Sequence, residues 1–147
     1  MIKLSQLLIA INKNLKSNFK DIKVDSKDLE ERFDRPSFRT SIDGLRTSAF
    51  GTTFKERRFT VRVYYFPKDK NNARLEKIKI IEGLEDSFLQ SLFITEKFVI
   101  PIEELHFQET DGVLVMDFDT VTFERIYNDL DIPLMEELDW KVNNNTN

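Results

Sequence analysis

The 147-residue sequence contains no cysteine, so disulfide bonds and thiolate metal sites are excluded and the fold must be held together by packing. It also lacks a long apolar run, and no stretch approaches the ~20 residues that a membrane-spanning helix needs. The opening stretch MIKLSQLLIAINKNLK turns polar within two helical turns and has no small-residue cleavage site, so we expect no signal peptide. The chain is therefore expected to be soluble, made in a cytoplasm and without membrane contact.

Catalytic motifs are missing as well. The sequence holds no GxGxxG, P-loop, HExxH or GxSxG motif. His106, the only histidine, is out of phase with its two apolar neighbours, which indicates polar strand surface. Asp117 and Asp119 share a strand face, with Glu109 on the facing arm, and such carboxylates can hold a hard metal ion. Since no Gly-rich ligand loop accompanies them, we expect no enzyme, metal or cofactor; a small metal-dependent enzyme using Asp117 and Asp119 remains an alternative.

The net charge is small, but the charged residues are distributed unevenly along the chain. The net charge is −4, which argues against nucleic acid as a main ligand. Residues 32–62 hold eight basic and three acidic side chains, whereas residues 101–147 hold twelve acidic and two basic ones. The basic run Arg57, Arg58 and Arg62 lies near Phe59 and Tyr64, but single-strand binders need a broadly positive groove. The distribution is either chance clustering of solvated charge or a domain whose opposite faces attract a copy of itself head to tail.

The residues that are present can build a core. Hydrophobic residues make up 40% of the chain and include 13 phenylalanines, and the length suits one domain. We predict a single domain over residues 1–140. The last residues, KVNNNTN, have nothing to bury, so residues 141–147 are expected to form a flexible tail.

Two segments have helical periodicity. Apolar residues recur at three- and four-residue steps near the N-terminus and predict a helix from about Lys3 to Phe19. A second stripe predicts a helix from about Asn72 to Ser91, capped by Asn71 or Asn72. That stripe consists of Ile78, Ile81, Leu84, Phe88 and Leu92. A short helical turn is expected in PLMEELDW.

Several segments have strand character. DIKVDS, SFRTSID and KFVIPIEE read as strands, and RRFTVRVYYF alternates strongly before Pro67 ends it. LHFQETDGVLVMDFDTVTF predicts a hairpin turning at Asp111 and Gly112. GLRTSAFGTTF, bracketed by Gly44 and Gly51, is small and polar, so residues 44–55 are expected to form a long loop between two antiparallel strands.

These elements define a fold class. Strands follow one another directly in two places, which favours antiparallel pairing, and both helices need a surface for an apolar stripe. We predict an α+β fold in which a single, mainly antiparallel β-sheet carries two long helices packed on one face.

Three segments also support a family resemblance. RPSFRTSID, RRFTVRVYYFPKD and DGVLVMDFD, in this order and at these separations, resemble the small tail terminator family of phages that infect Gram-positive bacteria. LSQLLIAINKNLKSNF and PLMEEL are similar too, so the likeness covers nearly the whole chain. RPSF and YYFP are structural signatures, and the specificity lies in the order of the segments. The tail KVNNNTN is longer and more polar than the family pattern.

The resemblance implies a role in assembly. Tail terminators are small α+β proteins that close into a six-membered ring on the last disc of the tail tube. The ring stops polymerisation and offers a surface to the head or collar. The implied partners are further copies in a hexamer, the tail tube protein and a head-tail connector or collar protein, while DNA only passes through the lumen. The implied location is the head-proximal end of the virion tail, assembled in the host bacterial cytoplasm; related proteins serve headless tail-like bacteriocins.

Four residues are candidates for a subunit or tube interface. Arg58 and Arg62 lie on the polar side of the longest strand, and Arg46 and Phe50 lie in the expected loop. Each has an ordinary alternative: the arginines as solvent-facing charge, and Phe50 as a cap on the core. A different head-tail joining or tail-completion component is the second functional reading.

Overall fold

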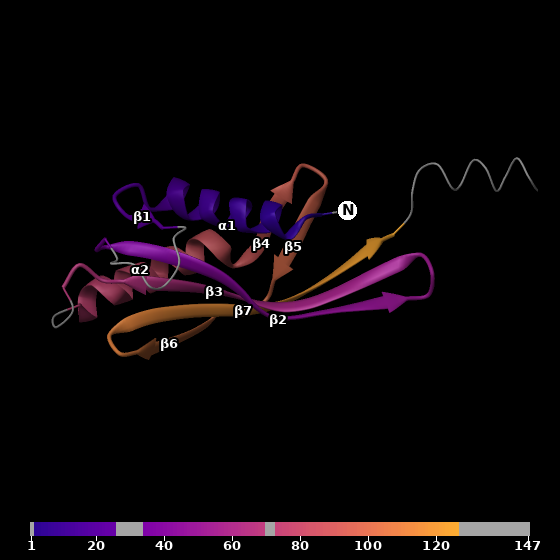
Figure 1. The fold of residues 1–147 in the computed structure, drawn as a ribbon. Helices are drawn as coiled ribbons and strands as arrows, with labels where there is room; N and C mark the ends of the chain where they lie inside the picture. Colours follow the sequence, from indigo (N-terminus) through magenta and orange to yellow (C-terminus); the bar gives the residue numbers. More distant parts are fainter. Residues whose placement is uncertain (1, 26–33, 70–72, 127–147) are drawn as a thin grey trace, which may run out of the picture.

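The computed structural model describes residues 2–25, 34–69 and 73–126. Each of the two helices is followed along the chain by a run of strands, as Figure 1 shows. In order they are α1 (Leu4–Asn18), β1 (Lys23–Val24), β2 (Ser37–Phe50), β3 (Phe54–Phe66), α2 (Arg74–Phe88), β4 (Gln90–Thr95), β5 (Phe98–Ile102), β6 (His106–Thr110) and β7 (Val113–Arg125). The expected turn in PLMEELDW and the tail 141–147 lie outside the described residues. Among the described helices, none has the length and apolar character to cross a membrane.

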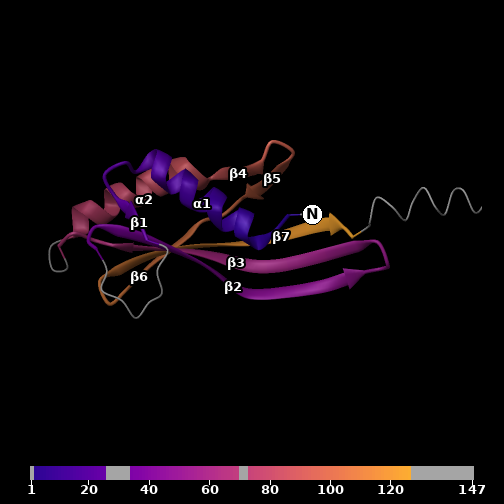
Figure 2. The same ribbon diagram turned by 45° about the horizontal axis from the view of Figure 1, so that its top comes forward.

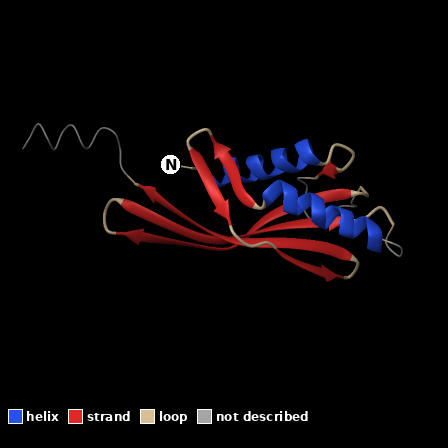
Figure 3. Cartoon of the chain, turned by 180° about the vertical axis from the view of Figure 1, so that it is seen from behind, coloured by secondary structure: helices blue, strands red, loops and turns tan. Residues whose placement is uncertain are grey.

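The strands form two sheets where the sequence predicts one. The larger has the order β1-β2-β3-β7-β6, with β1 parallel to β2 and the other pairs antiparallel. The smaller is an antiparallel pair of β4 and β5. The α+β class and the mainly antiparallel pairing are therefore confirmed, and the single sheet is wrong. In Figure 3 both helices and the small sheet lie on the same side of the large sheet.

Helix α1 follows its predicted stripe. Leu7, Ile11 and Leu15 are almost fully buried in the core. At the N-terminal end, the side-chain oxygen of Gln6 accepts a 3.0 Å hydrogen bond from the backbone N–H of Lys3. This bond satisfies a donor that the helix leaves unpaired, so the helix begins at Leu4.

Helix α2 is shorter than predicted and is rotated relative to the predicted stripe. It ends at Phe88, and Leu92 is buried from strand β4 instead. Ile78 is 45% exposed, while Lys77 is buried because its ammonium pairs with Glu109 on β6. The N-cap position is Ala73, which makes no side-chain hydrogen bond, and the expected caps Asn71 and Asn72 lie outside the described residues. Periodicity alone could not tell a lysine with a partner from one in solvent.

The largest correction concerns residues 44–55. They are not a loop, because β2 runs to Phe50 and β3 starts at Phe54, which makes a long hairpin with a tight turn. Gly44, at φ +61°, lies in a bulge between Asp43 and Arg46, and Gly51, at φ +66°, opens the turn. Backbone ladder bonds hold this part of the hairpin, and its side chains are exposed, so the sequence shows no apolar alternation there.

The remaining strand predictions are confirmed. Phe59, Val61, Val63 and Tyr65 form the buried side of β3, which ends at Phe66 just before Pro67. The β6–β7 hairpin turns at Asp111 and Gly112, both with positive φ, as a tight hairpin turn requires. Leu114, Met116 and Phe118 of β7 enter the same core as the β3 residues.

Tyr65 gives the core a measurable response to alkaline pH. Its hydroxyl is buried and donates a 2.5 Å hydrogen bond to Glu76 of α2. Burial, together with this bond and the Glu76 charge, raises the pKa of Tyr65 above its ordinary value near 10. Because the folded pKa is the higher one, the stabilisation is complete below pH ~10 and is lost above it.

We expect Tyr65→Phe to lower the free energy of unfolding by about 1–2 kcal/mol at pH 7, since Glu76 loses a hydrogen-bond donor. The variant should also lose less stability than wild type between about pH 9.5 and 11. Urea unfolding over this range measures both effects. Parallel pH curves for the two proteins would contradict the assignment.

Candidate assembly surface

The large sheet has one face away from the helices, here called the outer face. Side chains alternate along each strand, so the register assigns every residue to a side. The helix side of β3 carries Phe59, Val61, Val63 and Tyr65 in the core. The outer face includes Arg46, Ser48 and Phe50 from β2; Phe54, Glu56, Arg58, Thr60 and Arg62 from β3; and Asp117, Asp119, Val121 and Phe123 from β7.

All four candidate residues lie on this outer face. Arg46 pairs directly with Arg58 across the β2–β3 ladder, and Phe50 pairs with Phe54 beside the turn. Arg62 lies between Ser41 of β2 and Asp117 of β7. The bulge at Gly44 puts one extra residue into β2, and this brings Arg46 to the same side as Asp43. The fold thus gathers on one face residues that the sequence left in two separate segments.

Surface ion pairs and hydrogen bonds cover the middle of the outer face. Arg62 pairs with Asp43 at 3.2 Å, and Arg58 pairs with Glu56 at 2.8 Å. Thr60 donates a 2.6 Å hydrogen bond to Asp119. The Arg58 side chain is 67% exposed, and exposed pairs of this kind contribute at most about 1 kcal/mol. They can therefore exchange partners on binding at little cost.

An aromatic cluster occupies the far end of the outer face. We call Phe50, Phe54 and Phe123 the distal cluster: Phe123 stacks on Phe54 with ring centroids 4.9 Å apart and meets Phe50 edge-on at 5.5 Å. Phe50 is 63% exposed and Phe123 52%, and the neighbouring Val121 is also exposed. Three aromatic rings from three strands thus form an apolar patch in contact with water, a feature typical of interaction sites.

Sequence reasoning found Phe50 but missed Phe54 and Phe123. A signal was present in the last half of β7, where the alternation inverts. Thr120, Thr122 and Glu124 are buried on the helix side, whereas Val121 and Phe123 face out. The apolar residues on the exposed face of this segment are available for contact with another protein.

Of these inward residues, Glu124 binds the segment before α1, together with Arg57 of β3. The Glu124 carboxylate accepts a 2.8 Å hydrogen bond from the backbone N–H of Ile2, and the Arg57 guanidinium donates at 2.8 Å to the carbonyl of Ile2. Arg57 and Glu124 are 3.8 Å apart and both are largely buried. These contacts attach the residues preceding α1 to the helix side of β3 and β7.

Figures 1 and 2 show the part of the fold to which the distal cluster belongs. The far parts of β2, β3 and β7 extend beyond both helices as a three-stranded arm. The arm comprises residues 44–50, 54–58 and 121–125. Its β2 part and the start of β3 are the segment that the sequence assigned to a loop, residues 44–55.

The three carboxylates of the proposed metal site, Glu109, Asp117 and Asp119, do not lie on one face of the sheet. Glu109 pairs with Leu114 across the β6–β7 hairpin, so it lies on the helix side and binds Lys77. Asp117 and Asp119 lie on the outer face, and Asp117 contacts His106 at 3.2 Å. Over the described ranges, no group of three or more potential ligands converges on one point.

The basic run is divided between two faces as well. Arg57 points to the helix side and contacts Ile2, while Arg58 and Arg62 lie on the outer face. Phe59, which the sequence placed beside them, is buried in the core. These residues therefore cannot form one stacking groove for a nucleic acid strand.

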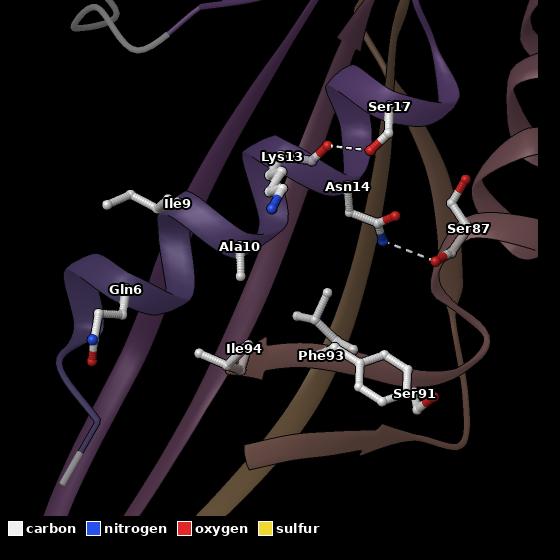
Figure 4. Close-up of a pocket in the computed structure, with 11 residues that line it drawn as sticks. Gln6, Ile9, Ala10, Lys13, Asn14, Ser17, Ser87, Ser91, Phe93 and Ile94 are labelled. Carbon is white, nitrogen blue, oxygen red and sulfur yellow. Dashed lines mark hydrogen bonds between the residues drawn. The ribbon is translucent and has the colours of Figure 1, made fainter. Parts of the chain in front are cut away.

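A second exposed apolar area lies between α1 and β4. Figure 4 shows Ile9 and Ala10 of α1 and Phe93 and Ile94 of β4 around a groove of about 570 Å³. Asn14 closes one end by donating a 2.8 Å hydrogen bond to the carbonyl of Ser87. Ile9 is 65% exposed and Phe93 69%, so the helix layer presents apolar surface too.

The described residues thus form an α+β domain that presents exposed apolar and charged surfaces on two sides. No curated protein sequence matches the chain. Residues 6–131, however, match the family model described as "Phage tail terminator protein". The chain therefore belongs to the phage tail terminator family, a family of virion-associated proteins, as the order of its segments indicated.

Proposed function

We propose that this protein closes the head-proximal end of a phage tail tube. Several copies, six by the resemblance described above, form a ring on the last disc of tube protein and stop further polymerisation. The free side of the ring then receives the head-tail connector or collar protein, and DNA passes through the lumen without being bound. In this role the chain performs no catalysis. The family match carries the proposal.

The structure supports the proposal through its surfaces. A subunit in a ring contacts at least two neighbours and the tube, so it needs several separate contact areas. The distal cluster on the arm and the groove between α1 and β4 come from different parts of the fold. Both hold exposed aromatic residues, which supply much of the energy of protein contacts.

Particles produced without the protein test this role. We expect tubes of variable and excessive length, or tubes that do not join their next component, in electron micrographs of a deletion strain. A plasmid copy of the wild-type gene should restore a narrow length distribution. Tubes of uniform length that join normally without the protein would contradict the proposal. Uniform tubes that remain unjoined would favour a different joining component.

A further inference from the structure

The arm has two strand edges without a ladder partner among the described residues. β6 pairs with β7 only over Val113–Asp117, although β7 continues to Arg125. β1 pairs with β2 only at Ser37 and Phe38, although β2 continues to Phe50. Strand edges of this length expose backbone N–H and C=O groups and readily accept another strand, so stable proteins usually cover them.

The two edges match each other in direction and extent. β2 and β7 are both antiparallel to the strand between them, β3, so they run the same way. Both extend to the tip of the arm, where Phe50, Phe54 and Arg125 occupy one level of the sheet. Rotation about a ring axis that runs along the strands preserves their direction, so it can bring β2 of one copy beside β7 of the next as a parallel pair.

Charge on the outer face distinguishes the two edges. Arg46 is exposed on β2, and Arg58 lies beside it on β3. Beside β7 is a hollow of about 600 Å³ whose lining includes Glu103, Glu104, Asp117 and Asp119. Two like edges would bring like charges together, whereas a β2 edge meeting a β7 edge brings arginines toward carboxylates.

We propose that the uncovered edge of β7 receives the uncovered edge of β2 from a second copy of this chain, so that the arms of neighbouring subunits form a continuous sheet. This inference deepens the proposed ring and rests on it. Main-chain hydrogen bonds between the edges supply affinity, as in β-strand addition. The charge difference between the edges makes the contact head-to-tail, which is the arrangement that closes a ring. The distal clusters of successive copies then lie on one shared face.

Engineered cysteines test the pairing inside assembled particles, and the native chain has no cysteine to interfere. One variant carries Ser48→Cys on β2 together with Val121→Cys on β7. Two further variants combine Ser48→Cys with Asp119→Cys or with Phe123→Cys, to cover small shifts in register. Within one copy, two strand spacings of about 5 Å each separate β2 from β7, which is too far for a disulfide. We expect at least one pair to yield, after mild oxidation, a ladder of covalent multimers that ends at the ring size.

Single-cysteine variants provide the control. Ser48→Cys alone and Val121→Cys alone should remain monomeric on a non-reducing gel. Efficient dimers from either one would mean that like edges meet, and would overturn the proposal. Particles of normal tube length that give no ladder with any pair would also overturn it while leaving the terminator role intact. Failure of the deletion test would count against the role itself.

Charge reversal provides an independent test. Arg46→Glu/Arg58→Glu and Glu104→Arg/Asp119→Arg should each reduce incorporation into particles by about tenfold or more, since each brings like charges together at every contact. The two variants expressed together should recover incorporation, because each then meets an opposite charge. Arg46→Glu alone serves if the double change next to Glu56 impairs folding. The matched control is Lys16→Glu/Lys79→Glu on the helices. An equal loss of incorporation in this control, or no recovery when the two variants are expressed together, would refute the pairing.

Discussion

Phe38→Ala should lower the free energy of unfolding by about 3–5 kcal/mol, because Phe38 fills the centre of the core. Its side chain is fully buried, and its ring lies 4.9 Å from that of Phe19 and 5.2 Å from that of Tyr65, between centroids. The change removes contacts with α1's C-terminal segment and with β3 together and leaves a cavity. Urea unfolding followed by circular dichroism measures the loss.

Phe50→Ala is the matched control, since it makes the same change in the same strand. Phe50 is 63% exposed, so we expect its loss to cost less than about 1 kcal/mol. Equal costs at the two positions would mean that the distal cluster is a second core and is not kept exposed for a partner. The expected difference separates residues that hold the fold from residues available for assembly.

Arg57→Met should lower the free energy of unfolding by about 3 kcal/mol. The change removes the guanidinium that lies 3.8 Å from the buried carboxylate of Glu124, and with it the hydrogen bond to the carbonyl of Ile2. Loss of one partner of a buried ion pair is costly because the remaining charge is not solvated. Urea unfolding again measures the effect, and the double variant Arg57→Met/Glu124→Leu should recover part of the loss.

The neighbouring arginine offers the control for this prediction. Arg58 lies on the outer face with a 67% exposed side chain, so Arg58→Met should change stability by less than about 1 kcal/mol. A similar loss in both variants would show that the burial of Arg57 has no special importance. Because adjacent strand residues point to opposite sides, the pair tests the assignment of the two faces directly.

The predicted and observed elements differ where the spacing of apolar residues no longer indicates helix or strand. The buried half of β3 and the β6–β7 hairpin were predictable, since alternation and the Asp111–Gly112 turn are local signals. The β2 part of the arm was not, because residues 44–50 lie in a ladder with both faces exposed and show no apolar alternation. The start of β4 fell within the predicted helix, since Leu92 continues the helical spacing although the chain turns at Gln90, with φ +92°.

The candidate surface was predictable only in part. Arg58 and Arg62 could be assigned to one side of β3 from alternation alone. Their proximity to Arg46 and Phe50 depends on the length of the β2–β3 hairpin and on the bulge at Gly44. Phe123 joins them because β7, distant in sequence, pairs with β3. The register of the β6–β7 hairpin puts Glu109 on the face opposite Asp117.

The sequence by itself determined the α+β class, the first helix, the buried faces of the main strands and the family, because these depend on local periodicity, turn residues and the order of segments. Tertiary structure alone decided the existence of the arm, the division into two sheets, the exposed distal cluster and the two strand edges that lack a ladder partner within residues 2–25, 34–69 and 73–126. These features depend on strand pairing between residues far apart in the chain. The backbone hydrogen bonds of such a pair are open to every sequence, so they leave no local signal in the residues themselves.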